Sequence, residues 1–377
     1  MKITGWELLT LPDGDDSMML LVLDTDEGLH GIGEVGIRSR QKAVAGGIEH
    51  LGELLLGEDP GRIEHLWQVM FRRGFFPADR FLSAAIAAVD VALWDIRGKS
   101  LGVPVHELFG GRVRDHVEAY VHLGDDLDGI LDRARARVAE GWRFLRFAVP
   151  HQDGGVLDQR ESMRAGIALF HAMREAVGPS VELILDVHTR LDPPEALTLC
   201  REIEAARPYF VEDPLRCEGL DSYRMLRART AVPLAAGEQF GSKWEFQRLV
   251  EGDLIDYARV DVGVAAGLTE ARKIAAMCEA HYVKLATHNP LGPVTAASSL
   301  ALNLSSPYVG VQEHQADPSP VLDSLFTARP RIAAGRVEPS DLPGLGVDVD
   351  RAEARRYQAT ASERPHLRSR DGAFTNW

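Results

Sequence analysis

The chain has 377 residues, of which 45% are hydrophobic and 26% are charged, and its formal net charge at pH 7 is −14. This composition is typical of a folded globular protein and excludes a fibrous or disordered chain. The negative charge would repel nucleic acid and anionic membranes, so we expect neither as a partner and favour a small molecule. An acidic small molecule would need a metal ion or buried Arg and Lys side chains near its binding site.

Apolar runs such as Met18–Leu23 are much shorter than the ~20 residues of a membrane-spanning helix. Strand-like sequence follows Met1 directly, without the features of a signal peptide, so we expect a cytoplasmic protein. The three cysteines, Cys200, Cys217 and Cys278, are scattered and form no CxxC pair. Their spacing favours reduced thiols over disulfide bonds or a zinc site.

The first part of the chain, residues 1–115, reads as strands followed by helices, and we expect it to form one domain. Met18–Asp24 and Gly28–Gly33 predict a hairpin punctuated by glycines. Ser83–Lys99 is rich in alanine and apolar on nearly all sides, which is typical of a helix buried between layers. Gly110 and Gly111 end this helical region.

Residues 116–328 alternate short apolar runs with amphipathic helical stretches, the pattern of parallel βα units. Eight such runs favour a closed βα barrel over an open doubly wound sheet. Gly263 and Gly267 do not form a GxGxxG motif, and no GxxxxGK[ST] motif occurs, so no nucleotide site is indicated. Residues 329–377 are at first loop-like, and we expect them to return across the first domain. The predicted strands are Val117–Val121, Phe144–Val149, Glu182–Leu185, Tyr209–Val211, Val232–Ala236, Ile255–Val260, Val283–Ala286 and Tyr308–Val311.

Acidic residues follow three consecutive predicted strands. The same number of residues, about one βα repeat, separates Asp186 from Glu212 and Glu212 from Glu238. Because chemistry in a βα barrel lies at the carboxyl ends of the strands, these three side chains can converge on one point. Hard oxygen ligands of this kind suit Mg²⁺, which keeps its other positions for water and substrate. A single acid at a strand end is more often a helix cap or a loop charge, but three at one register favour a metal site.

Two histidines follow predicted strands near these acids. Asp186 and His188 are two residues apart on one strand, so both side chains face the same mouth. On the sixth and seventh strands, Asp261 can accept a hydrogen bond from His288 and orient its imidazole as a base. The alternative for each histidine is a structural residue with satisfied hydrogen bonds.

Three further residues at strand ends leave alternatives open. Glu313, after the eighth strand, could donate to an oxyanion if protonated, or could be a solvated rim acid. Arg146 on the second strand can act as an electrostatic clamp for an acid substrate, and Ala148 beyond it cannot titrate. His122, after the first strand, could contact substrate or be a core histidine.

Seven segments spread along the chain resemble those of the enolase superfamily, mandelate racemase subgroup, and above all its acid-sugar dehydratases. The resemblance implies a (β/α)₇β barrel with an α+β capping domain built from both termini. It also implies that Asp186, Glu212 and Glu238 hold Mg²⁺ and that His288 with Asp261 forms the catalytic dyad. The segments are Ala92–Ile96, Leu185–His188, Val211–Pro214, Ala236–Gln239, Gly267–Glu270, His288–Pro293 and Pro343–Val347.

The reaction that the resemblance implies is the dehydration of an acid sugar to a 2-keto-3-deoxy acid. In it His288 removes the α-proton, His188 protonates the departing β-hydroxyl, and Mg²⁺, Arg146 and Glu313 stabilise the developing charge. The substrate would contact His122 and two residues of the capping loops, Arg38 and Arg80. The family also suggests a homo-oligomer.

Two differences from related enzymes narrow the reaction and the substrate that the resemblance implies. Racemases of the subgroup carry a Lys-x-Lys pair on the second strand, where this chain has Arg146-Phe-Ala148. Mannonate dehydratases pair the strand-two Arg with a Tyr on the next loop, but no Tyr occurs between Tyr120 and Tyr209. With His288 as the only base, the resemblance implies an aldonic acid such as galactonate or gluconate. An epimerase or racemase, which would exchange the α-proton without loss of water, and a barrel that binds an acid sugar without turnover are the alternatives.

Overall fold

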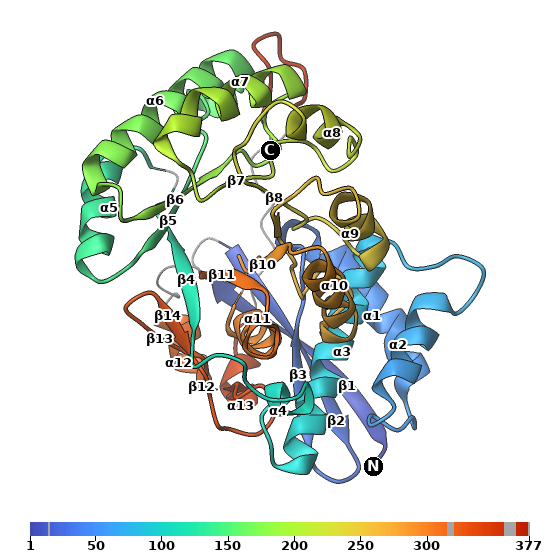
Figure 1. Ribbon diagram of the computed structural model, residues 1–377. Coiled ribbons are helices and arrows are strands. Elements are labelled where there is room, and N and C mark those ends of the chain that lie inside the picture. Colours follow the sequence, from blue (N-terminus) through green and yellow to red (C-terminus); the bar gives the residue numbers. More distant parts are fainter. Residues whose placement is uncertain (14–15, 125, 291, 315–319, 358–366, 376–377) are drawn as a thin grey trace.

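A capping domain and a barrel make up the computed structural model, which describes residues 1–13, 16–124, 126–290, 292–314, 320–357 and 367–375 (Figure 1). The N-terminal sheet is antiparallel, in the order β1-β2-β3, and so contains the predicted hairpin. A long helix, α3, is buried along most of its length, as its alanine-rich sequence predicts. The capping elements are β1 (Ile3–Asp13), β2 (Asp16–Thr25), β3 (His30–Glu34), α1 (Gln41–Leu55), α2 (Ile63–Arg72), α3 (Arg80–Leu101) and α4 (Val105–Leu108).

The barrel consists of parallel strands β4 to β11, and pairing between β11 and β4 closes it. Helices lie between neighbouring strands, so the predicted (β/α)₇β barrel is confirmed. Its strands are β4 (Val117–His122), β5 (Phe144–Ala148), β6 (Glu182–Asp186), β7 (Phe210–Glu212), β8 (Leu234–Ala236), β9 (Tyr257–Ala258), β10 (Lys284–Thr287) and β11 (Val309–His314). Its helices are α5 (Ile130–Ala139), α6 (Gln159–Val177), α7 (Pro193–Ile203), α8 (Ser222–Arg227), α9 (Lys243–Val250), α10 (Leu268–Ala280) and α11 (Pro293–Ser305).

One apolar layer fills the inside of the barrel. Each strand contributes one buried side chain to it, and the aromatic ones pack against each other, as Phe210 does with Tyr257. Because side chains alternate along a strand, the residue two positions later on each strand faces the same interior, one step nearer the carboxyl end. The layer therefore places those later residues at the mouth. Its members are Tyr120, Phe144, Ile184, Phe210, Ala235, Tyr257, Ala286 and Val311.

Buried polar contacts join the capping domain to the barrel. Glu34 at the end of β3 accepts hydrogen bonds from the backbone N–H groups of Gly292 and Thr295, at the start of α11. Asp90 of α3 accepts from the N–H and the hydroxyl of Thr269, at the start of α10. Because these carboxylates lie at helix N-termini, the helix dipoles favour their charge.

The C-terminal part of the chain contacts both domains. Here β14 (Arg336–Glu338) pairs with β4 and with β13 (Arg331–Ala333), and β12 (Phe326–Ala328) pairs with β15 (Asp348–Val349). Two helices, α12 (Pro320–Leu325) and α13 (Arg351–Ala354), lie near β1, and Arg351 donates to Glu7 and Asp24 of the N-terminal sheet. Residues 367–375 instead contact the barrel, where Arg370 pairs with Asp158. The predicted boundaries at residues 115 and 328 stay predictions.

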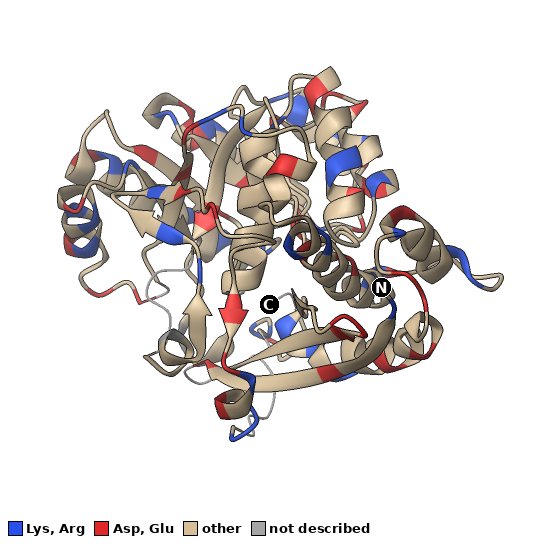
Figure 2. Cartoon of the chain, turned by 90° about the horizontal axis from the view of Figure 1, so that it is seen from below, with Lys and Arg blue, Asp and Glu red and all other residues tan. Residues whose placement is uncertain are grey.

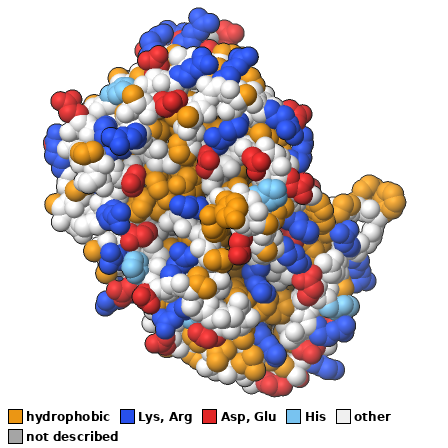
Figure 3. Space-filling model, in the orientation of Figure 1, with side chains coloured by type: hydrophobic (Ala, Val, Ile, Leu, Met, Phe, Trp, Pro, Cys, Tyr) orange, Lys and Arg blue, Asp and Glu red, His pale blue; other side chains and the backbone are white. Residues whose placement is uncertain are grey.

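Acidic and basic residues are interspersed along the chain (Figure 2), and the face seen in Figure 3 mixes acidic, basic and apolar side chains. No helix among the described residues has the length and apolar character needed to cross a bilayer. The loop between α2 and α3 extends away from the body of the molecule, and hydrophobic atoms cover its tip (Figures 1 and 3). In it, Phe75 is 91% exposed and Phe76 81% exposed.

Candidate active and metal site

A layer of polar side chains lies above the apolar layer of the barrel, at the carboxyl ends of its strands. Seven strands continue from an apolar residue to a charged or imidazole side chain two positions later, while on β8 Gly237 takes that place and Glu238 follows. The side chains are those of His122, Arg146, Asp186, Glu212, Arg259, His288 and Glu313. The alternation that builds the barrel thus gathers most of the predicted site residues in one plane.

Three acidic side chains form the closest cluster in this layer. One carboxylate oxygen from each of Glu212, Asp213 and Glu238 lies within 4.8 Å of the other two. Gly237, with φ of +127°, lets the chain turn beside the Phe246 ring, which a Cβ would approach to 2.3 Å. Burial and the neighbouring acids raise the pKa of Glu238 far above its usual value and that of Asp213 to about 8. The carboxylates therefore repel each other when no cation lies between them.

The contacts of Glu212 are those expected of a metal ligand. This side chain is fully buried, and among the described residues neither of its oxygens, nor Oδ2 of Asp213, accepts a hydrogen bond of good geometry. The positive charge next to it is that of Arg259, whose Nη2 lies 2.7 Å from Glu212 Oε1. Buried carboxylates with too few hydrogen-bond donors are costly, and a divalent cation is the kind of group that satisfies them. The donor set, all of it carboxylate oxygen, fits Mg²⁺.

Asp186 lies beside this cluster but has other partners. It is in register with Glu212 on the neighbouring strand, and it accepts a hydrogen bond from the guanidinium of Arg146. Its Oδ1 accepts from the backbone N–H of His188 at 2.6 Å. Arg146 Nε is also 3.9 Å from Glu212 Oε2. Arg146 therefore lies next to two of the three predicted metal ligands, Asp186 and Glu212.

The predicted His–Asp pair is present. His288 Nδ1 is 2.7 Å from Asp261 Oδ2, and its Nε2 is 3.4 Å from Glu238 Oε2. Because Asp261 accepts a hydrogen bond from Nδ1–H, a neutral ring has its lone pair on Nε2, which faces the acid cluster. Burial disfavours the charged ring, but Glu238, Glu313 and Asp261 outweigh it and raise the pKa of His288 to about 9.

His188 approaches the same carboxylate from the other oxygen. Its Nε2 is 3.8 Å from Glu238 Oε1, and its Nδ1 is 3.9 Å from Asp186 Oδ2. Burial and the charges of Arg146 and Arg190 lower the pKa of His188 to about 3, so the ring is neutral in the free site. His188, with φ of 54°, and Thr189, with φ of 57°, adopt the left-handed conformation, a strain that is common at functional sites.

Glu313 is held as an ionised acceptor. Its Oε2 accepts from Arg259 at 2.6 Å and from the N–H of Asn289 at 3.1 Å, and its Oε1 lies 2.5 Å from His122 Nε2. His122 Nδ1 must accept from Arg146, since arginine only donates, so Nε2–H donates to Glu313. Burial opposes the charge of Glu313, but His288, Arg259 and His122 lower its pKa far below the usual value. Glu313 is thus neither a solvated rim acid nor, in this state, a protonated donor.

The two arginines predicted to contact substrate from the capping domain have acidic partners. Arg38 Nη2 is 2.7 Å from Asp13 Oδ2. Arg80 Nη2 donates to Glu245 at 2.8 Å, and Arg80 Nη1 contacts Cys217. Both guanidinium groups are therefore paired with carboxylates of the protein.

Two residues of the site were not identified from the sequence. Arg259 is 0% exposed and contacts three acids of the mouth. The sequence could have indicated it, because an arginine within the predicted strand Ile255–Val260 would be buried and would need buried acidic partners. Asp213 follows Glu212 directly, and its position in the sequence does not distinguish it from an ordinary acidic residue of a loop.

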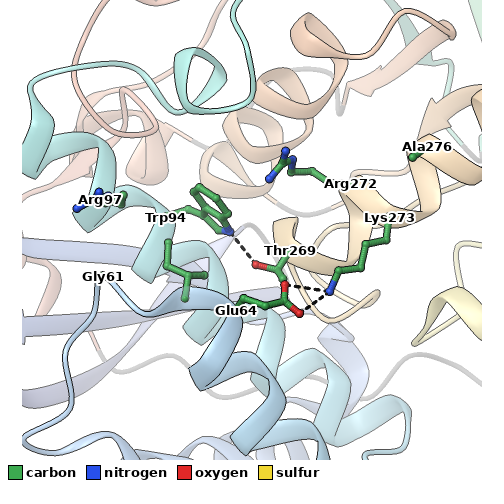
Figure 4. Close-up of a pocket in the computed structure, with 9 residues that line it drawn as sticks. Gly61, Glu64, Trp94, Arg97, Thr269, Arg272, Lys273 and Ala276 are labelled. Atoms are coloured by element: carbon green, nitrogen blue, oxygen red, sulfur yellow. Dashed lines mark hydrogen bonds and ion pairs between the residues drawn. The ribbon is translucent and has the colours of Figure 1, made fainter.

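A separate hollow of about 520 Å³ lies between the capping domain and α10 (Figure 4). Trp94 donates to the hydroxyl of Thr269 at 2.9 Å, and Lys273 pairs with Glu64 at 2.8 Å. None of the predicted site residues is among those that line it. The candidate site is therefore the barrel mouth.

Comparisons with known proteins agree with this geometry. Residues 12–110 match the mandelate racemase / muconate lactonizing enzyme N-terminal domain, and residues 129–354 match the enolase C-terminal domain-like family. The D-galactonate dehydratase of Ralstonia pickettii (strain 12J) is 38% identical over 386 residues, which cover 100% of both chains. That of Variovorax paradoxus (strain S110) is also 38% identical and covers 95% of this chain and 96% of its own.

Two solved structures have the same fold over 99% of both chains. An enolase from Pantoea ananatis with bound D-gluconate and Mg superimposes with a TM-score of 0.93 at 31% identity. An enolase from Agrobacterium radiobacter with bound Na and L-malate superimposes with a TM-score of 0.91 at 28% identity. From these matches along the whole chain, the protein belongs to the mandelate racemase / muconate lactonizing enzyme family of the enolase superfamily.

Proposed function

We propose that this protein is a Mg²⁺-dependent dehydratase of an aldonic acid such as galactonate or gluconate, with a 2-keto-3-deoxy acid as its product. The observation that carries the proposal is the His288–Asp261 pair, at 2.7 Å, whose free imidazole nitrogen faces the buried carboxylates. The D-galactonate dehydratase relatives and the neighbour crystallised with D-gluconate and Mg support it.

The proposed metal ligands are Asp186, Glu212 and Glu238. Mg²⁺ bound there would supply positive charge to a substrate carboxylate as that group becomes an enediolate. Asp213 lies in the same cluster and would keep Glu238 in place through the hydrogen bond between their side chains.

The proposed base is His288, whose Nε2 would take the proton from C2 of the acid sugar. Asp261 holds the ring by its Nδ1–H, so Nε2 stays directed at the mouth. The charge of Mg²⁺ among the acids that raise the pKa of His288 would favour the neutral ring, which is the form that accepts a proton. Arg146, next to Asp186, would offer a fixed positive charge to the substrate carboxylate.

The proposed acid is His188, which lies on the other side of Glu238. The carboxylate of a bound acid sugar adds negative charge near this ring and favours its protonated form. The C3 hydroxyl then leaves as water with the proton of His188, and the enol formed tautomerises to the 2-keto-3-deoxy acid. One water is lost overall.

Roles for Glu313 and His122 follow from their hydrogen bonds. We assign Glu313 to holding His122 and Arg259 and to keeping negative charge near His288, and His122 to orienting Arg146. Contacts of the substrate with Arg38 and Arg80 stay predictions, as does a location in the cytoplasm. Assembly into a homo-oligomer also stays a prediction, which the exposed Phe75 and Phe76 support because large exposed apolar groups often mark interfaces.

The test is a screen of purified protein against C5 and C6 aldonic and aldaric acids with Mg²⁺, with chemical detection of 2-keto-3-deoxy acids. We expect product from at least one aldonic acid. Absence of product from the whole set would contradict the proposal, and α-deuteration in D₂O without loss of water would identify an epimerase instead.

A further inference from the structure

Arg259 has the most crowded set of contacts in the barrel mouth. Its Nη2 lies 2.7 Å from Glu212 Oε1, 2.6 Å from Glu313 Oε2 and 3.7 Å from Glu238 Oε2. Its Nη1 donates to the backbone carbonyl of Ala286 on β10 at 3.0 Å. One guanidinium from the end of β9 therefore reaches acids that come from β7, from β11 and from the turn after β8.

The side chain is fixed as well as buried. It is 0% exposed, and its guanidinium lies 5.4 Å from the centre of the Tyr120 ring, which belongs to the apolar layer below. The Ala286 carbonyl holds one terminal nitrogen, so the other is directed at the acids. A guanidinium donates along fixed directions in its plane, and it therefore orients its partners as well as neutralising them.

Two of the three acids, Glu212 and Glu238, are proposed ligands of Mg²⁺, and the third, Glu313, is 3.9 Å from Nε2 of the proposed base. Arg259 therefore contacts two proposed metal ligands and also the acid next to the proposed base. Arg146 serves the other edge, where it contacts Asp186 and His122.

We propose that Arg259 is a positioning residue that holds Glu212, Glu238 and Glu313 at fixed distances from one another. The proposed metal site and the proposed base then keep a fixed distance as well. The inference rests on the proposed function for its chemistry. It assigns to Arg259 no contact with the reacting atoms.

A charge role and a positioning role predict opposite effects on Mg²⁺ binding. If Arg259 only neutralised the acids, its removal would leave the mouth more negative, and Mg²⁺ would bind more tightly. If Arg259 positions the acids, its removal lets them move apart, and Mg²⁺ binds less tightly although the site is more negative. Loss of a partner that orients metal ligands typically costs 10–100-fold in affinity.

The experiment is isothermal titration of MgCl₂, without substrate, into the wild type, Arg259→Gln and Arg259→Lys. We expect Mg²⁺ to bind at least about tenfold more weakly to Arg259→Gln. We expect the same direction for Arg259→Lys, because an ammonium keeps the charge but cannot bridge the acids in one plane. Equal or tighter binding to Arg259→Gln, or wild-type affinity in Arg259→Lys, would overturn the proposal.

A matched control is Arg174→Gln. Arg174 donates to the backbone carbonyls of Gly178, Val181 and Ala206, outside the mouth. This variant should lower the melting temperature and leave Mg²⁺ affinity unchanged, which separates lost stability from lost positioning. Circular dichroism and melting curves show which variants are folded, and if Arg259→Gln does not fold, Arg259→Lys, which keeps the buried cation, decides.

The result is independent of turnover. If no acid sugar is dehydrated but Mg²⁺ binding falls in both Arg259 variants, the proposed function fails and the positioning role stands. If the wild type makes product and both variants bind Mg²⁺ as it does, the positioning role fails and the proposed function stands.

Discussion

Buried carboxylates occur in two regions of this molecule, the barrel mouth and the seam between capping domain and barrel, and their surroundings differ. At the seam, Glu34 accepts from two backbone N–H groups and one hydroxyl, and Asp90 accepts from the N–H and the hydroxyl of Thr269. In the mouth, Glu212 is equally buried, yet within the described residues neither of its oxygens accepts a hydrogen bond of good geometry, and its ion pair with Arg259 is shared with Glu238 and Glu313.

The difference separates structural acids from functional ones. A buried acid whose oxygens are satisfied by N–H and O–H donors stabilises the packing of two elements. Acids that crowd together without enough donors lower stability unless a ligand supplies the missing charge. Burial alone therefore does not identify a functional acid, whereas the crowding of buried acids with too few donors around Glu212 points to a bound cation.

The largest expected effect concerns His288, the proposed catalytic base. In His288→Asn the Asp261 partner stays, but no nitrogen can accept a proton, so kcat should fall on the order of 10²–10⁴-fold. Mg²⁺ affinity should change little, because His288 is not a proposed ligand. Steady-state kinetics on the acid sugar found in the screen measures the change.

The chain supplies a matched control for this variant. His281 Nδ1 lies 3.6 Å from Asp253, a second His–Asp pair, but on the surface after α10. His281→Asn should keep the wild-type kcat. A comparable loss of kcat in both variants would contradict the role of His288 as the catalytic base.

A smaller effect is expected at the seam. In Asp90→Asn the single amide oxygen can accept from the N–H or from the hydroxyl of Thr269 but not replace both carboxylate oxygens, so one donor lacks an acceptor and the free energy of unfolding should fall by about 1–3 kcal/mol. Asp79→Asn is the control, since Asp79 caps the same helix at the surface and Asn caps equally well. Thermal melts of both variants test this, and an equal Tm for Asp90→Asn and wild type would contradict the structural role of Asp90.

The smallest effect is the pH dependence of stability. Burial raises the pKa of Glu34 from 4.5 to about 7, and hydrogen bonds from Thr295 and Gly292 only partly oppose it. The folded state then binds the proton more tightly than the unfolded state, so this contribution to stability is full below pH 4.5 and is lost as pH rises through about 7. In melts between pH 5 and 8, Glu34→Gln should have a flatter profile than the wild type. A steeper or unchanged profile would assign the dependence to other groups.

The sequence was most informative where chain order determines position. Strand spacing placed Asp186, Glu212 and Glu238 at the same end of the barrel, and side-chain alternation placed His288 near them. His188 was expected on the strand of Asp186, but β6 ends at Asp186 and His188 follows in the left-handed conformation. It could not supply partners chosen by the fold over long distances. Arg38 and Arg80 pair with Asp13 and Glu245, which no local pattern indicates.

Two features of the mouth show the same limit. The role of Arg259 cannot be predicted from its own strand, because its acidic partners come from β7, from β11 and from the turn after β8. The ionised state of Glu313 depends on His122, Arg259 and Asn289, which come from three different parts of the chain. Charge and protonation in a buried network follow from three-dimensional neighbours, so the sequence left both alternatives for Glu313 open.

The central claim is that the acids crowded around Glu212 in the mouth, which have too few donors, serve a divalent cation, while the acids of the seam, whose oxygens accept hydrogen bonds, do not. Isothermal titration of MgCl₂ into the wild type, Glu212→Gln and Glu34→Gln tests it most directly. The account predicts one Mg²⁺ per chain in the wild type and in Glu34→Gln, and binding to Glu212→Gln weaker by more than the ~100-fold that loss of an outer partner costs. Equal Mg²⁺ affinity in Glu212→Gln and the wild type would contradict it.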